Sequence, residues 1–202
     1  TLLISDKKKL FVLHWFELGH LFVEPYNSMA EFLPLLELSY WFDMTLFGLN
    51  PTAFRLHNVI LYLLALPLVY GTTLELWRYF RPSDKASAPW VAAVVTALFA
   101  LHPAFVESVV WISGRKYVLA NLFAMLALWF AVNARREYGL AAPHAIAALI
   151  AFVAMMLSKS SYVALAPIIT ILWVFFWLDI PKPNRHRSVL LWPIALLFLA
   201  IS

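Results

Sequence analysis

Residues that could do chemistry gather in the stretch 102–116. This stretch contains an imidazole, a carboxylate, a turn-forming pair and two cations: His102, Glu107, Ser113, Gly114, Arg115 and Lys116. The turn-forming pair predicts a helix that begins at the two cations, where backbone N–H groups and the helix dipole also favour an anion. A guanidinium fork beside an ammonium suits a phosphate. The stretch therefore indicates an anion site. In the alternative interpretation the two cations extend to a membrane interface and the carboxylate pairs with one of them.

Lys159 is a second candidate, because it is the sole charged residue of the 41-residue stretch 138–178. Three serines flank it: Ser158, Ser160 and Ser161. The pattern predicts a tight turn that carries one ammonium. This ammonium anchors the turn at the interface, unless it approaches Arg115 and Lys116 in space and joins their anion site.

Arg55, His57 and Asn58 form a third polar group, at the start of an apolar run. We interpret them first as a hydrogen-bonded network at the interface. The histidines of the chain lack the spacing of a metal motif, so no metal site is assigned and zinc is not expected. The chain also contains neither a glycine-rich phosphate loop nor a nucleophile elbow.

The composition defines the elements that must position these residues. Of 202 residues, 63% are apolar and only 13% are charged, whereas soluble domains are roughly 45–50% apolar and about 25% charged. The chain has no cysteine and a net charge of +4. This composition excludes a soluble globule, a disordered chain, a nucleic-acid-binding domain and a disulfide-stapled module. It predicts an integral membrane protein.

Runs without charged residues set the expected spans. A helix needs about 20 apolar residues to cross the hydrocarbon, and lipid offers no partner to an unpaired backbone. We therefore predict an all-α, polytopic helical bundle of about six spans, near 56–76, 86–102, 117–134, 139–158, 161–178 and 188–202. These spans make up a transmembrane region, 52–202. Residues 1–51 mix aromatic rings with carboxylates and are expected to form an amphipathic segment along the outer interface.

The basic residues of the short loops predict the orientation. Eight lie on one side of the predicted bundle and three on the other. By the positive-inside rule the eight face the cytoplasm, which places residues 1–51, the stretch 102–116 and Lys159 on the lumenal or periplasmic face. The chain begins without Met and stops inside a predicted span, so we interpret it as part of a longer protein.

Three sequence blocks resemble one protein family. The chain reads LFGLNP at 46–51, HPAFVESVVWISGRK at 102–116 and LSKSS at 157–161. From about Glu31 onward it resembles the membrane half of the transmembrane-and-tetratricopeptide-repeat (TMTC-like) proteins. Those proteins are GT-C-type glycosyltransferases, which take a sugar, typically mannose, from a polyprenyl-phosphate donor. They place it on Ser or Thr of a protein in the lumen or periplasm and usually carry helical repeats after the membrane part.

The resemblance implies roles for the candidate residues. Arg115, Lys116 and Lys159 would bind the lipid phosphate of the donor, with Ser113, Gly114 and Asn58 in support. The catalytic residue is left open, with Glu107 and His102 as candidates. The implied donor is a polyprenyl-phosphate sugar, and the implied partners are membrane lipid and a protein acceptor or a larger membrane complex. From the residues themselves we expect neither a divalent metal nor a nucleic-acid partner. The implied location is a bacterial inner membrane or an ER-type membrane.

The chain also departs from the family pattern. Its arginine-containing element reads FLPL at 32–35, Phe105 replaces a histidine and Tyr117 replaces an aspartate. The family pattern has a pair of acids that would lie upstream of Thr1, and this sequence does not contain it. Two hypotheses follow. In the first, the chain belongs to a polyprenyl-phosphate-dependent transferase, and Arg115→Ala and Lys116→Ala abolish donor use without unfolding it. In the second, it is a non-catalytic scaffold or accessory subunit of a larger membrane complex. A transporter fits less well, because the charges lie at the ends of the spans.

Overall fold

The computed structural model describes residues 32–134, 141–165, 167–168 and 171. Its elements are, in chain order, α2 (Pro34–Phe47), α3 (Pro51–Phe80), α4 (Ala88–Ala100), α5 (Pro103–Val110), η2 (Ile112–Gly114), α6 (Arg115–Asn133), α7 (Ala141–Ser158) and η3 (Ser160–Leu165). Throughout these described residues the regular structure is helical and no strand occurs. The predicted all-α class is therefore confirmed for this part of the chain.

The described residues contain two helical segments that could span a membrane, or three if a bent pair is counted as one span. Two helical segments are long and apolar enough to cross a membrane, Pro51–Phe80 and Ile112–Asn133, and they match the spans expected near 56–76 and 117–134. A third span results only if α4 and α5 count together, although they meet at a bend of 55°. The helical run at Pro143–Ser158 is apolar but shorter than a span. Six spans are therefore not confirmed in the described residues.

The remaining expected segments cannot be compared with the structure. The span near 188–202, most of the span near 161–178, and residues 1–31 of the interfacial segment lie outside the described residues.

The helix in the span expected near 86–102 is shorter than expected, since it ends at Ala100 and a new helix begins at Pro103. Proline lacks the N–H that would continue a helical ladder, so it starts a helix more readily than it extends one.

Local chemistry explains where the first two described helices begin and end. Pro34 is the first residue of α2, and Gly48 follows the last residue with a φ of 62°, a conformation that glycine adopts without a steric penalty. Pro51 is the first residue of α3, and the Asn50 side chain accepts a hydrogen bond from the N–H of Thr52 at 3.0 Å. These residues let the chain turn sharply from α2 into α3.

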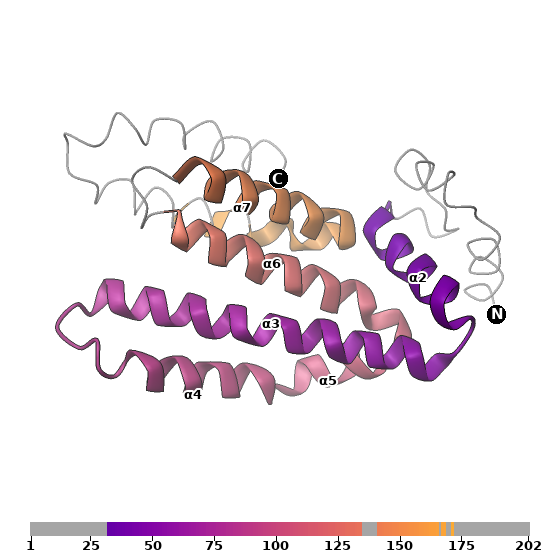
Figure 1. The fold of residues 1–202 in the computed structure, drawn as a ribbon, viewed down its shortest axis with the longest axis horizontal. Coiled ribbons are helices and arrows are strands. Elements are labelled where there is room, and N and C mark those ends of the chain that lie inside the picture. Colours follow the sequence, from indigo (N-terminus) through magenta and orange to yellow (C-terminus); the bar gives the residue numbers. More distant parts are fainter. Residues whose placement is uncertain (1–31, 135–140, 166, 169–170, 172–202) are drawn as a thin grey trace.

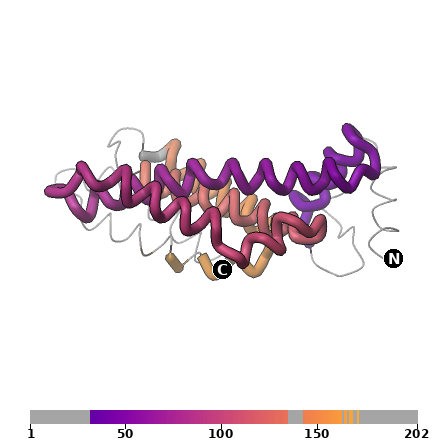
Figure 2. The backbone as a smooth tube through the Cα atoms, turned by 90° about the horizontal axis from the view of Figure 1, so that it is seen from below, coloured from indigo at the N-terminus to yellow at the C-terminus, as the bar shows by residue number. Residues whose placement is uncertain are grey.

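The helices run back and forth along one long axis (Figure 1). α3 packs against both α4 and α6, and α6 packs against α7. α2 lies at the end of the bundle where α3 and α6 begin and α7 ends. The view turned by 90° shows the same elongated arrangement (Figure 2). Three helix ends and α2 thus meet at one end of the bundle, which we call the α2 end.

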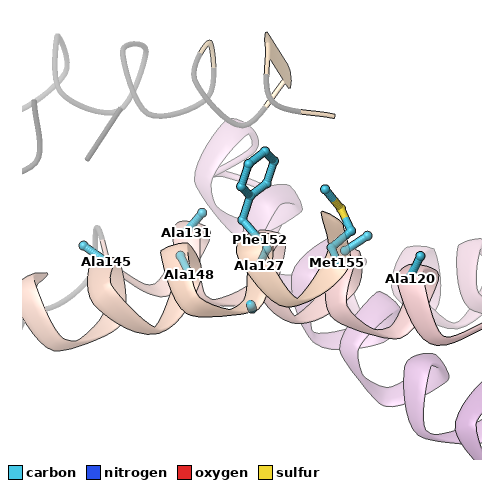
Figure 3. Close-up of a cluster of buried hydrophobic side chains, with 9 residues drawn as sticks. Ala120, Ala127, Ala131, Ala145, Ala148, Phe152 and Met155 are labelled. Carbon is cyan, nitrogen blue, oxygen red and sulfur yellow. The ribbon is translucent and has the colours of Figure 1, made fainter. Parts of the chain in front are cut away.

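Small side chains form the contact between α6 and α7 (Figure 3). Its buried residues are Ala120, Ala124, Ala127, Ala131, Ala145, Ala148, Ala151, Phe152 and Met155. Alanines spaced three or four residues apart lie on one face of a helix and let two backbones approach closely. Close van der Waals packing of this kind drives helix association in a membrane, where hydrophobic burial contributes little. This seam fixes the end of α7, and with it Lys159, relative to α6.

Candidate functional site

Arg115 points into the bundle at the α2 end. It is the first residue of α6 and its exposed fraction is 0%. Its Nε donates to Asn58 Oδ1 at 2.8 Å, its Nη2 donates to the Phe54 carbonyl at 2.8 Å, and its Nη1 donates to the Ser39 carbonyl at 3.2 Å. The guanidinium therefore joins the start of α6 to α2 and α3.

Asp43 supplies the opposite charge to Arg115. Its side chain is fully buried, and its Oδ2 lies 2.5 Å from Arg115 Nη2. The contact is an ion pair, and no well-directed hydrogen bond from another described residue reaches this Oδ2. The other oxygen, Oδ1, lies 2.5 Å from Nδ1 of His57. We call Asp43, His57, Asn58 and Arg115 the buried polar network.

Two aromatic rings enclose the guanidinium. Its central carbon lies 4.8 Å from the centre of the Tyr40 ring and 5.3 Å from that of Phe54, within the range of cation–π attraction. The Tyr40 hydroxyl donates to the Ile112 carbonyl at 2.6 Å. Burial raises the pKa of Tyr40 to about 12, while nearby Arg115 lowers it and Asp43 raises it further. The neutral Tyr40 side chain therefore holds the turn before α6.

Asn58 and Gly114 shape the turn before α6. Asn58 is fully buried, and its Nδ2 donates to the Trp111 carbonyl at 3.0 Å. A Cβ atom at Gly114 would lie 2.3 Å from the Ser108 carbonyl oxygen, so this contact admits only glycine without a backbone shift. Ser113 is exposed on the same turn. Two of the three predicted supporting residues, Asn58 and Gly114, thus hold the turn that positions α6. Of the expected polar group, His57 and Asn58 belong to the buried polar network, whereas Arg55 is exposed.

Lys116 and Lys159 approach the same aromatic ring. Lys116 Nζ lies 5.5 Å from the centre of the Tyr117 ring, and Lys159 Nζ lies 6.0 Å from it. Lys116 is half-buried and Lys159 is 9% exposed. The hydroxyl of Tyr162 donates to the Tyr117 carbonyl at 3.4 Å, which ties the turn after α7 to the first turn of α6. We call Lys116, Tyr117 and Lys159 the two-lysine cluster.

The structure thus separates the three predicted phosphate-binding cations. Lys116 and Lys159 both lie near the Tyr117 ring. Arg115 instead contacts the carboxylate and carbonyl oxygens of its own chain. Adjacent residues of an α-helix point in directions about 100° apart, so an inward Arg115 is compatible with a Lys116 that reaches the surface.

His102 and Glu107 lie on exposed surface around α5. The Nδ1 of His102 accepts a hydrogen bond from the N–H of Ala104 at 3.2 Å, which caps α5. Across the described residues, no ion pair joins Glu107 to a cation. The alternative in which Glu107 pairs with Arg115 is therefore wrong, since Arg115 pairs with Asp43. Within the same residues, no group of three acidic or histidine side chains could hold a metal ion.

Sequence reasoning missed Asp43 as a site residue and included it only among the carboxylates of an interfacial segment. The ion pair joins residues 72 positions apart, and nothing local marks them as partners. A signal was nevertheless present. An arginine next to an apolar helix needs an anion if it is buried, and Asp43 is one of the few acidic residues near the start of a predicted span.

Comparison with known proteins supports part of the predicted resemblance. Over 102 residues the chain is 35% identical to Protein O-mannosyl-transferase TMTC1 of Mus musculus and 33% identical to the human protein of that name. These residues make up 50% of the chain and 10% of each relative. No family model matches the chain, and no solved structure matches it significantly. The chain is thus an apolar, helical protein with a TMTC-like similarity over half of its length.

Proposed function

We propose that the chain is the membrane portion of a glycosyltransferase that uses a polyprenyl-phosphate sugar, with mannose as the expected sugar and a Ser or Thr hydroxyl as the acceptor. One observation carries the proposal. Two lysines that are distant in sequence, Lys116 in the first turn of α6 and Lys159 between α7 and η3, place their ammonium groups near the Tyr117 ring. The similarity to an O-mannosyl-transferase supports the reaction class.

The two-lysine cluster has the chemistry that a lipid-phosphate leaving group needs. When the bond between the sugar and the phosphate breaks, negative charge develops on the phosphate oxygens. Two preorganised ammonium groups stabilise this charge, and they do so more strongly where water is partly excluded. Lys159 meets this condition, because only 9% of it is exposed. The cluster lies at a helix end, where a lipid headgroup would meet the bundle.

Arg115 serves this site indirectly. Its contacts with Asp43 and with the Phe54 carbonyl fix the first turn of α6, and this turn carries both Lys116 and Tyr117. We therefore assign phosphate binding to the two lysines and positioning to Arg115. This assignment replaces the direct phosphate contact first expected of Arg115.

Binding of a polyprenyl monophosphate to the chain in nanodiscs tests the proposal. We expect Lys116→Ala and Lys159→Ala each to weaken binding several-fold and the double variant to weaken it about 10-fold or more, since charged contacts contribute about 1.5–3 kcal/mol. The matched control is Lys85→Ala, which removes an exposed lysine from the loop between α3 and α4. An uncharged polyprenol measures the contribution of the tail. Equal phosphate affinity in the double variant and in the wild type would contradict the proposal.

Transfer is measured separately from binding. The wild-type chain is incubated with a polyprenyl-phosphate mannose and a Ser/Thr-rich peptide, and the glycosylated peptide is detected by mass spectrometry. We expect transfer to fall in parallel with donor affinity in the lysine variants. Donor binding without any transfer would favour the second candidate below.

The second candidate is a non-catalytic scaffold or accessory subunit of a larger membrane complex. Three observations favour it. The guanidinium of Arg115 is used within the chain, Phe105 packs against the Tyr62 and Phe99 rings, and Tyr117 stands where the family pattern has an aspartate. Purification in mild detergent tests it: a stable partner retained through size exclusion supports this candidate, and a lone chain that transfers sugar rejects it.

A further inference from the structure

We propose that His57, positioned by Asp43, accepts the proton of the hydroxyl group that receives the sugar. The inference rests on the proposed function and deepens it by naming a base that neither the sequence motifs nor the relatives assign. Its starting point is the buried polar network. Asp43, Asn58 and Arg115 are fully buried, whereas 24% of the His57 side chain is exposed.

The carboxylate of Asp43 sets the proton on the imidazole ring. An ionised carboxylate only accepts hydrogen bonds, so the 2.5 Å contact between Asp43 Oδ1 and His57 Nδ1 requires a hydrogen on Nδ1. In a neutral imidazole, Nε2 then carries the free lone pair. No hydrogen bond joins Nε2 to any other residue that the structure describes. The ring thus has a buried, fixed side and a basic nitrogen on its other side.

Arg115 completes the arrangement. It pairs with Oδ2 of Asp43 and leaves Oδ1 to the histidine. The carboxylate is therefore held between a permanent cation and an imidazole, and it stabilises the imidazolium that forms when Nε2 takes a proton. Carboxylate and histidine act together in this way in hydrolases, where the acid fixes the tautomer and orientation of the ring.

The network also places His57 at the end of the bundle that carries the two-lysine cluster. His57 lies in the second turn of α3, and α3 and α6 begin at the α2 end (Figure 1). The chain of contacts from His57 through Asp43 to Arg115 ends one residue before Lys116. A proton acceptor and the proposed phosphate-binding cations thus occupy one end of the molecule.

The proposed step is balanced without a further reactant. The acceptor oxygen forms a bond to C1 of the sugar, and the bond between C1 and the phosphate oxygen breaks. The phosphate leaves with the electron pair of that bond and is held by Lys116 and Lys159. The hydroxyl proton moves to Nε2 of His57, and the imidazolium later releases it to water.

The tautomer of His57 tests the inference without any activity. We expect ¹⁵N NMR of the histidine-labelled chain in nanodiscs, assigned with His57→Gln, to show Nδ1 protonated and Nε2 bare in the neutral ring. In Asp43→Asn the new amide oxygen turns to Arg115, so its NH₂ faces Nδ1 and the proton moves to Nε2. A wild-type ring protonated on Nε2 would overturn the inference.

Kinetics separate the base from donor binding. A general base contributes about 10²–10⁴-fold, so we expect His57→Gln and Asp43→Asn to lower kcat at least about 10²-fold. Donor affinity should change less than about twofold in His57→Gln, which leaves the ion pair between Asp43 and Arg115 in place. The matched control is His144→Gln near the start of α7, which should keep full transfer.

Full transfer by His57→Gln would overturn the role of His57 as the base and leave the proposed function intact. A wild type that binds the phosphate but transfers nothing overturns both, and loss of phosphate binding in His57→Gln reduces His57 to a structural residue.

Discussion

Removal of Arg115 should strongly destabilise the fold, because it leaves Asp43 buried without its main counter-charge. Both side chains are fully buried, and their closest charged atoms are 2.5 Å apart. Breaking a buried ion pair by removing one partner costs about 3–5 kcal/mol, whereas replacing both partners by apolar residues of similar size is neutral or stabilising. For a chain of about 200 residues, each kcal/mol corresponds to about 2–4 °C in Tm. We therefore expect Arg115→Met to lower the Tm by roughly 6–20 °C.

A double-mutant cycle tests this reasoning. The variants are Arg115→Met, Asp43→Leu and the two combined, with thermal unfolding followed by tryptophan fluorescence in detergent. The double variant should recover much of the loss, which gives a coupling energy above about 2 kcal/mol.

The control is the pair of Arg78 and Glu75, whose charged atoms lie 3.4 Å apart and whose arginine side chain is 41% exposed. Arg78→Met should cost less than Arg115→Met, because solvent reaches the Arg78 side chain and screens its charge. The reasoning is refuted if Arg115→Met costs no more than Arg78→Met, or if the two network substitutions are simply additive.

Three further predictions concern substitutions of single residues. Gly114→Ala places a Cβ 2.3 Å from the Ser108 carbonyl oxygen and should cost about 1–3 kcal/mol, with proteolytic nicking between α5 and α6 as the measurement. Ala127→Leu overpacks a fully buried position between α6 and α7 and should cost about 1–3 kcal/mol by thermal unfolding, whereas Ala127→Ser should be tolerated. Tyr40 keeps its proton up to a pKa of about 12 when folded but loses it near 10 when unfolded. Wild-type stability should therefore fall by about 1.4 kcal/mol per pH unit between these values. Tyr40→Phe should remove this part of the alkaline loss, and an unchanged slope in that variant would reject the assignment.

Local rules account for several of the helix ends in the described region. Gly114 precedes α6, as the turn-forming pair predicted, and Pro34, Gly48 and Pro51 bound α2 and the start of α3. Each of these residues acts through its own backbone, so the signal lies within a few positions of the chain. The number of spans was predicted less well. A run without charges shows that a segment is apolar, but Pro103 divides one such run into two short helices.

The candidate site was predicted only in part, because the contacts of its residues depend on the tertiary fold. Sequence spacing identified Arg115 and Lys116 as a pair of cations at a helix start, which the structure confirms. Spacing could not tell that the first points inward and the second outward, because this depends on which face of α6 meets α3. It also could not pair Arg115 with Asp43, since residues 72 positions apart meet only through the tertiary fold.

Arg115 is assigned to positioning and Lys116 to phosphate binding, so variants of these two residues must be interpreted differently. Loss of donor use in Arg115→Ala does not by itself identify a phosphate ligand, since the same substitution releases the turn that carries Lys116. Lys116→Ala alters a half-buried side chain outside the Asp43 ion pair, so loss of donor use in that variant with an unchanged Tm points to the phosphate. The opposite pattern, a normal donor affinity in Lys116→Ala and a lowered Tm in Arg115→Ala, would mean that the helix start is purely structural. The two adjacent residues together therefore distinguish a transferase from a scaffold that has kept its fold and lost its site.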